Sequence, residues 1–292
     1  MKTKGTNIYP YWLSFPALGV YSVFYVLPLV AALALSITDW NAMRFWEPEF
    51  VGIDNFLNFF TDKNFFVALK NTFLIAGVTT IMKTLIGFLL ALALIKPLKT
   101  RNLMRTVYFM PAVYSSVLIG LIFTSIFRMD GLFTDMVHLM GFNGVDVDWL
   151  GNPDYSLYVI MFTEIWQWSG YSMIIFIAGL QSIPKEYYEA SEIDGASSFQ
   201  QMWNITIPML TAAFNLCITI ALIGGLKIFA TVFVLTNGGP GFETDVLARY
   251  TYMTFGQGLY GKASAISLAQ SIIIIIFSLT LNSWMKRKEV EL

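Results

Sequence analysis

The stretch QSIPKEYYEASEIDGASSFQQMWNITIP occupies residues 181–208 and separates two apolar segments, residues 155–180 and 210–235. Each apolar segment has the roughly 20 residues that an α-helix needs to cross a bilayer. A polar connection of this length exceeds what a tight turn requires, and such loops in compact proteins are usually functional or disordered. We therefore predict a functional loop at a membrane surface, held between two transmembrane helices.

The loop has the composition of two short helices. Residues 185–193 are mostly helix formers, and Gly195 suits a helix end at which the backbone needs a positive φ. Ser197 or Ser198 can cap a second helix, because a hydroxyl accepts hydrogen bonds from the free N–H groups of a first turn. An amphipathic connector resting on lipid headgroups would show a similar pattern.

Apolar segments recur outward from this loop. The remaining predicted spans are residues 12–37, 68–95, 106–128 and 264–285. The chain is 56% hydrophobic and 13% charged, whereas soluble domains are about 45–50% apolar and about 25% charged. No small-residue cleavage site follows the first segment, so we expect it to be retained rather than removed as a signal peptide. We predict an all-α membrane protein with a single domain, residues 1–292, and six transmembrane helices.

The distribution of lysine and arginine predicts the orientation, because loops that stay inside the cell collect these residues. If the N-terminus is inside, ten of them fall on the inner side: Lys2, Lys4, Lys96, Lys99, Arg101, Arg105, Lys185, Lys286, Arg287 and Lys288. Six fall on the outer side: Arg44, Lys63, Lys70, Arg128, Arg249 and Lys262. We therefore predict that both termini and the loop at 181–208 are cytoplasmic.

Several classes of function are disfavoured by composition. Cys217 is the single cysteine and His138 the single histidine, which excludes an intramolecular disulfide and leaves little for a metal site or histidine catalysis. The net charge of −1, without a basic stripe, gives no sign of nucleic-acid binding. Residues 256–263, GQGLYGKA, nearly match a phosphate-binding loop, but Ala263 stands where that loop needs a hydroxyl group and no strand precedes it. We expect no ATP to bind there.

Three separated motifs resemble one protein family. EAS at 189–191, Gly195 and ITIP at 205–208 have the spacing Glu-Ala-Ala, three residues, Gly, nine residues, Ile-x-Leu-Pro. This pattern is typical of permease subunits of binding-protein-dependent ABC importers. The residues around it, TNGGP at 236–240 and VGIDNF at 51–56 resemble the carbohydrate-uptake branch, the maltose-type permeases. Serine and isoleucine replace alanine and leucine in the first motif, and both departures are conservative.

The resemblance implies a type I ABC importer permease fold, in which the loop between the fourth and fifth spans carries a coupling helix that docks on an ATPase subunit. The residues that would make this contact are Glu189, Ala190, Ser191, Asp194 and Gly195. The chain would not be an enzyme and would bind no cofactor, because ATP and Mg²⁺ belong to the ATPase. The implied partners are a second homologous permease, two ATPase subunits and an extracytoplasmic sugar-binding protein, in a bacterial or archaeal cytoplasmic membrane.

Polar residues and glycines within two spans are candidates for a substrate pocket, because polar groups in a membrane are costly and often functional. They are Glu164, Gln167, Trp168 and Tyr171 on the fourth span, and Gly224, Gly225, Lys227 and Ile228 on the fifth. The first four share one helical face, and aromatic rings beside polar groups suit a sugar. The resemblance implies a sugar pocket on these same two spans. Ordinary helix packing explains aromatic residues and glycines equally well.

Three ionisable residues lie deep within predicted spans. Glu164 and Lys227 fall at nearly the same depth, and a lone charge there costs at least about 2.5–3.5 kcal/mol. We therefore predict that these two pair or share a wet cavity. Lys83, near the middle of the second span, either pairs with an acid of the partner permease or lines the aqueous path.

Two other functions stay open beside the import of a sugar or oligosaccharide. The same machine would import a phosphorylated polyol, such as glycerol phosphate, if the pocket were strongly basic, and Lys227 alone supports this. A stand-alone secondary transporter would have inverted repeats with broken helices. The sequence reveals neither feature, and this alternative leaves the loop motif unexplained.

Overall fold

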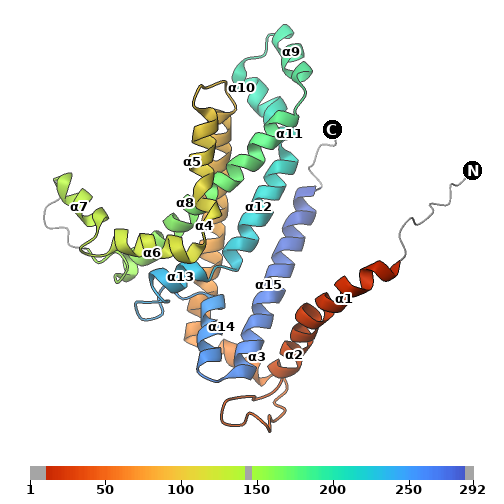
Figure 1. The fold of residues 1–292 in the computed structure, drawn as a ribbon, viewed down its shortest axis with the longest axis vertical. Helices are drawn as coiled ribbons and strands as arrows, with labels where there is room; N and C mark the ends of the chain where they lie inside the picture. Colours follow the sequence, from red (N-terminus) through yellow and green to blue (C-terminus); the bar gives the residue numbers. More distant parts are fainter. Residues whose placement is uncertain (1–10, 142–146, 287–292) are drawn as a thin grey trace, which may run out of the picture. The chain divides into compact units, whose positions relative to one another are not determined.

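The computed structural model describes residues 11–141 and 147–286, which are helical apart from their connections and one isolated bridge between Thr38 and Phe50 (Figure 1). Four helices are long and apolar enough to cross a membrane: Trp12–Ser36, Lys63–Leu94, Ser116–Leu139 and Tyr260–Lys286. A fifth candidate is the pair Ser198–Met209 and Thr211–Leu226, which is bent by 63°. The prediction of an all-α, multi-pass membrane protein is confirmed, with four or five such spans among the described residues.

The fourth predicted span corresponds to α8, Pro153–Ser182. Its 30 residues are long enough to cross a bilayer, but it is not among the helices that are apolar enough by composition. The reason is that α8 buries polar side chains inside the protein, among them Thr163, Glu164 and Gln167. Six spans therefore stay a prediction.

The chain forms two compact units. The smaller consists of residues 11–61 and 251–269, and the larger of residues 62–250 and 270–286. The helices of the smaller unit are α1 (Phe15–Tyr21), α2 (Leu27–Ser36), α3 (Asp54–Leu57), most of α14 (Leu247–Gly256) and the start of α15 (Tyr260–Lys286). Apolar side chains of α1 and α2 are exposed almost throughout, as a bilayer environment favours.

The stretch that resembles a phosphate-binding loop is a packing element of the smaller unit. The N–H of Ala42 donates to the carbonyl of Gly258 at 2.8 Å, and that of Gly261 donates to the carbonyl of Trp40 at 2.8 Å. A β-carbon at Gly261 would collide with the carbonyl of Thr38. These glycines are therefore explained by close contact with the loop that follows α2, without any phosphate.

Long helices form the centre of the larger unit. α4 (Lys63–Leu94) packs against both α8 and α12 (Thr211–Leu226), and α5 (Arg101–Val113) packs against α8. Gly170 permits the contact between α5 and α8, because a β-carbon there would collide with the carbonyl of Tyr108. The helices that position the candidate site are thus in close backbone contact.

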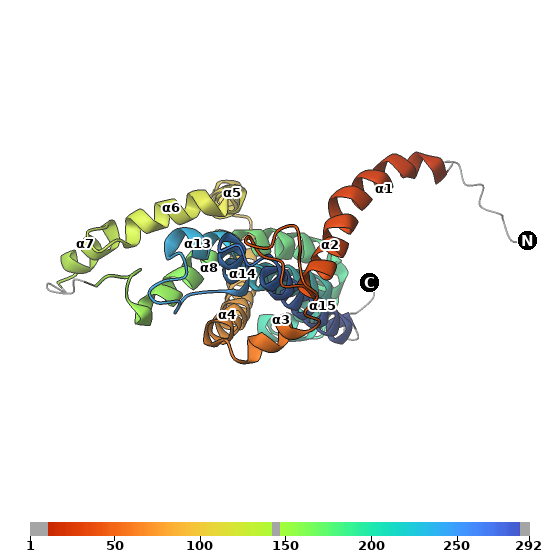
Figure 2. The same cartoon turned by 90° about the horizontal axis from the view of Figure 1, so that it is seen from below.

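The third predicted span, residues 106–128, is wrong as a single helix. α5 ends and α6 (Ser116–Phe127) begins on either side of two extended residues, Tyr114 and Ser115, and α6 leaves α5 at a steep angle (Figure 2). Pro111, inside α5, lacks the N–H needed for a helical hydrogen bond. The hydroxyl of Ser115 accepts a bond from the first turn of α6 at 3.2 Å, which caps the new helix. α7 (Leu132–Leu139) follows α6.

The fifth predicted span, residues 210–235, is also broken. α12 ends at Leu226, and α13 (Ala230–Leu235) begins after Phe229, whose φ of −140° is not helical. α13 then packs against α6. The two apolar runs therefore each contribute two helices to the larger unit.

Two buried glutamines satisfy the backbone at these breaks. Nε2 of Gln167 donates to the carbonyl of Tyr114 at 3.1 Å, and Nε2 of Gln270 donates to the carbonyl of Leu226 at 2.8 Å. Non-helical backbone at membrane depth is tolerated where protein groups or a water-filled cavity satisfy it. The breaks are thus built into the protein by specific side chains.

The two short helices predicted in the inner loop are confirmed as α9 (Lys185–Ile193) and α10 (Ser198–Gln201). Gly195 has a φ of +77°, as predicted for the end of α9. Ser197 caps α10 in a reciprocal pair with Gln200. A π-helical turn and α11 (Ile207–Met209) then lead into α12.

The orientation stays a prediction, and four of the basic residues behind it lie outside the described residues: Lys2, Lys4, Arg287 and Lys288. A cysteine at exposed Asp154, in the first turn of α8, is expected to react with an impermeant thiol reagent added outside the cell. A cysteine at exposed Glu192 in α9 is expected not to react. Both belong in a Cys217→Ser background, and labelling at Glu192 alone would reverse the orientation.

Candidate functional site

A cavity of about 380 Å³ lies in the larger unit where the two helix breaks meet α4, α8 and α12. Six of the eight residues predicted for a substrate pocket line it: Glu164, Trp168, Tyr171, Gly224, Lys227 and Ile228. Five other polar or thiol-bearing residues also line the cavity, namely Lys83, Ser116, Ser172, Cys217 and Thr231. Lining the aqueous path was one of two alternatives predicted for Lys83, and none of the other four was among the predicted pocket residues. Four of the five come from α4, α6, α12 and α13, and Ser172 comes from α8. That the cavity binds a substrate stays a prediction.

Gln167 and Gly225 do not line the cavity, and helix packing accounts for both. Gln167 is fully buried and satisfies the break before α6. A β-carbon at Gly225 would lie 2.6 Å from the Cα of Ala76 on α4, so this glycine permits the crossing of α4 and α12. The adjacent Gly224 has open space where a β-carbon would be and faces the cavity.

The predicted pairing of Glu164 with Lys227 is wrong, because Glu164 pairs with Lys83 instead. Glu164 and Lys227 do line the same cavity, which was the alternative prediction for them. Nζ of Lys83 on α4 lies 2.9 Å from Oε2 of Glu164 on α8, and the hydroxyl of Thr231 on α13 donates to Oε1 at 2.6 Å. Lys83 is only 3% exposed and Glu164 only 6%. Lys227 lies where α12 ends, and its side chain is exposed toward the cavity. The charges of Lys83 and Glu164 therefore neutralise each other.

A tightly packed pair of rings forms part of the cavity wall. The ring centroids of Trp168 and Tyr171 lie 6.3 Å apart at an interplanar angle of 80°. Hydroxyls from Ser116 and Thr231 come from the helices that follow the two breaks. Apolar ring faces beside hydroxyl and charged groups match the mixed apolar and polar surface of a small polyhydroxylated ligand.

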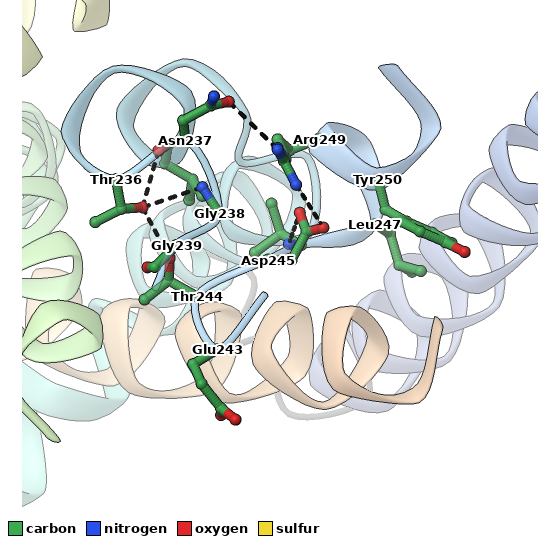
Figure 3. A network of polar contacts seen from close by, with 12 residues as sticks. Thr236, Asn237, Gly238, Gly239, Glu243, Thr244, Asp245, Leu247, Arg249 and Tyr250 are labelled. Atoms are coloured by element: carbon green, nitrogen blue, oxygen red, sulfur yellow. Dashed lines mark hydrogen bonds and ion pairs between the residues drawn. The ribbon is translucent and has the colours of Figure 1, made fainter. Parts of the chain in front are cut away.

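The TNGGP motif forms a hydrogen-bonded loop after α13 (Figure 3). The hydroxyls of Thr236 and Thr244 are 2.8 Å apart, and Thr244 also donates to the carbonyl of Gly239 at 2.6 Å. Asn237 and Gly238 both have positive φ, +48° and +78°. The motif is thus closed into a loop by hydrogen bonds between its own residues and Thr244, which follows it.

Arg249 holds this loop from the side of α14. Its guanidinium bonds to Asp245 at 2.8 Å and to the side-chain oxygen of Asn237 at 3.4 Å (Figure 3). Burial raises the pKa of the Asp245 carboxyl above its ordinary value, and the Arg249 guanidinium opposes that rise. Asn71 on α4 donates to the carbonyls of Glu243 and Asp245 at 2.8 Å and 3.0 Å. The loop is therefore fixed to α4, within the larger unit.

Replacing Gly238 with alanine is expected to lower the thermal unfolding midpoint more than replacing Gly241. Both have positive φ, which costs a non-glycine residue about 1–2 kcal/mol. A β-carbon at Gly238 would also lie 2.6 Å from Nη1 of Arg249, whereas Gly241 has open space. Thermal unfolding of the two variants in detergent checks this. Equal shifts would show that the Arg249 contact adds nothing.

The residues predicted to contact an ATPase lie on the surface of α9 and the turn after it. Glu189, Ala190, Asp194 and Gly195 are exposed, and Ser191 is half-buried. The hydroxyl of Ser191 donates to the carbonyl of Tyr188 at 2.7 Å and accepts from Nε2 of Gln201 at 2.9 Å. The serine that departs from the family pattern therefore links α9 to α10.

Three comparisons with known proteins agree on the class of protein to which this chain is similar. The family described as "Binding-protein-dependent transport system inner membrane component" matches residues 83–288. The chain is 32% identical to the probable ABC transporter permease protein YurN of Bacillus subtilis over 98% of both chains. It is 33% identical to the multiple sugar-binding transport system permease protein MsmF of Streptococcus mutans over 92% of both.

Among solved structures, a crystal structure of a bacterial ABC transporter involved in the import of the acidic polysaccharide alginate has a similar fold. The TM-score is 0.82 at 24% identity, over 95% of this chain and 94% of that chain. The agreement of this fold with a family match over most of the sequence settles the class of the protein. The chain belongs to the family of inner-membrane components of binding-protein-dependent transport systems.

Proposed function

We propose that this chain is a membrane-spanning subunit of an ATP-driven importer that moves a sugar or oligosaccharide delivered by an extracytoplasmic binding protein. The observation that carries the cargo class is the cavity, where Trp168 and Tyr171 stand beside hydroxyl and paired charged groups. Family membership supports the delivery by a binding protein, and a relative whose name includes sugar-binding transport supports the same cargo.

In the proposed machine the chain pairs with a second homologous permease and with two ATPase subunits that bind ATP and Mg²⁺, while this chain binds no cofactor. The exposed face of α9 and α10 is the proposed contact with the ATPase. Ile193 is 88% exposed and Phe199 is 71% exposed, and such apolar side chains beside Glu189 favour burial in a partner. ATP-driven movement of the ATPases would then be transmitted through α9 and α10, which the hydrogen bond between Ser191 and Gln201 links.

The phosphorylated-polyol alternative has one observation in its favour, the exposed ammonium of Lys227 in the cavity. It required a strongly basic pocket, yet the buried Lys83 is neutralised by Glu164. The secondary-transporter alternative was disfavoured by the apparent lack of broken helices. That argument fails, since the described residues contain two breaks. Family membership now argues against it instead.

Uptake by whole cells tests the cargo. Cells lacking this chain are expected to lose uptake of at least one of radiolabelled maltose, trehalose, lactose and raffinose, and to regain it when the chain is restored. Glycerol 3-phosphate serves as the comparison substrate. A loss confined to glycerol 3-phosphate would support the phosphorylated-polyol alternative and contradict the sugar assignment.

A further inference from the structure

The Lys83 ammonium has hydrogen-bonding capacity that Glu164 does not use. An ammonium group has three N–H donors and a carboxylate has about four acceptor sites. Among the described residues, Lys83 makes one such bond, to Oε2 of Glu164, and Glu164 accepts one further bond from Thr231. Both side chains line the cavity although their exposed fractions are only 3% and 6%. Two donors and about two acceptor sites therefore remain for whatever enters the cavity.

Leaving such groups unsatisfied is unfavourable, because a buried donor without a partner loses its bond to water and gains nothing in return. When cargo displaces water from the cavity, it must replace those bonds. A hydroxyl group can bond both to the free donors of Lys83 and to the free acceptor sites of Glu164, since it donates one hydrogen bond and accepts two.

We propose that Lys83 and Glu164 act together as a binding site for two neighbouring hydroxyl groups of an uncharged sugar ring. This inference rests on the proposed function. The ammonium of Lys83 donates a hydrogen bond to the oxygen of one hydroxyl, and the carboxylate of Glu164 accepts a hydrogen bond from the neighbouring hydroxyl. Nζ and Oε2 are 2.9 Å apart, one hydrogen-bond length, which is also the separation of two gauche hydroxyl oxygens on adjacent ring carbons. The two pairs of atoms thus match in spacing.

The charge of the pair determines the class of ligand. Lys83 and Glu164 are neutral together, so an uncharged diol satisfies them without bringing a counter-charge into the cavity. An anionic group, by contrast, would approach the Glu164 carboxylate or displace it from Lys83, and either change leaves a buried charge unpaired. Trp168 lines the same cavity and offers its ring to the C–H face of the sugar.

Discrimination between a transported sugar and its monodeoxy analogues tests this site. The assembled complex in proteoliposomes, with its binding protein, is given whichever of maltose, trehalose, lactose or raffinose it transports, and then the analogues lacking one hydroxyl. The variants are Lys83→Met with Glu164→Gln, and Lys70→Met as a control, because Lys70 is an exposed lysine on the same helix, α4, outside the cavity lining. The binding protein is the same throughout, so the change in preference between complexes reports the cavity alone.

The preference is the ratio of transport of the parent sugar to transport of the analogue. For at least one analogue, this ratio is expected to be about tenfold to a hundredfold larger in the native complex than in the double variant, which is the effect of a hydrogen bond to a charged group. Lys70→Met should keep the native preference. Lys83→Arg keeps the ion pair but points its N–H donors in other directions. It should therefore change which monodeoxy analogue is discriminated against. This result tests the site even if the double variant does not fold. A preference that is identical in the native complex, the double variant and Lys83→Arg would overturn the site alone. Failure of the native complex to transport any of the four sugars would overturn the proposed function, and the site with it.

Discussion

Replacing Gly195 with tryptophan is expected to abolish sugar-stimulated ATP hydrolysis by the assembled complex while the chain stays folded in the membrane. Gly195 ends α9 with a φ of +77°, and among the described residues, its chain neighbours apart, no heavy atom lies within 4 Å of a β-carbon placed there. A bulky side chain therefore meets open space in this chain and collides only with a docked partner. We propose that the Glu189 carboxylate accepts a charge-assisted hydrogen bond from an arginine or lysine of the ATPase. Replacing exposed Glu189 with lysine should therefore have the same effect, because it places two positive charges together.

Gly141 provides a matched control for the tryptophan. It also has a positive φ, +93°, and no heavy atom of the described residues, its chain neighbours apart, lies within 4 Å of a β-carbon there, but it lies after α7 rather than after α9. Gly141→Trp should leave stimulated ATP hydrolysis nearly unchanged. Glu189→Gln, which removes only the charge, should reduce it by about tenfold to a hundredfold, the value of one charge-assisted bond. If Gly195→Trp and Glu189→Lys both keep native stimulation, the α9 segment is not the coupling element.

Lys83→Met alone is expected to destabilise the chain far more than Lys83→Met combined with Glu164→Gln. Removing one partner strands the other charge in the protein interior, which costs about 3–5 kcal/mol, whereas replacing both by neutral groups of similar volume is often close to neutral. Glu164→Gln alone should be damaging for the same reason. Thermal unfolding midpoints and transport at equal expression are the quantities to measure.

Lys227→Met is the comparison variant for this series. Its side chain is exposed and, among the described residues, makes no ion pair, so the unfolding midpoint should change little. Strictly additive effects of the Lys83 and Glu164 changes would show that the 2.9 Å pair contributes no coupling.

Features that depend on local chemistry were predictable from the sequence. The positive φ of Gly195 and the cap at Ser197 follow from glycine's freedom and a hydroxyl's acceptor, and both are confirmed. The helix breaks were not predicted, because residues 114–115 and 227–229 lie inside long runs that are mostly apolar and that were each assigned to one helix. The groups that stabilise the breaks are Gln167 and Gln270, distant in sequence, and no local pattern connects them to their carbonyl partners.

The candidate site was predictable in outline. Helical periodicity brought Glu164, Trp168 and Tyr171 to one face, and the structure places all three around the cavity. The charge pairing was wrong because depth along a helix does not say which helix is adjacent. α4 packs directly against α8 and brings Lys83 to Glu164, whereas Lys227 follows the end of α12 at Leu226. Pairing every buried cation with every buried acid would have included the correct partner.

Transport by the purified complex tests the central claim most directly. Proteoliposomes that contain this chain, its partner permease and the ATPase subunits are loaded with ATP, and the binding protein and a radiolabelled sugar found in the uptake experiment are added outside. We predict that the sugar accumulates inside only when both ATP and the binding protein are present, and that a non-hydrolysable ATP analogue does not support accumulation. Sugar accumulation driven by an ion gradient, without ATP or binding protein, would contradict the account.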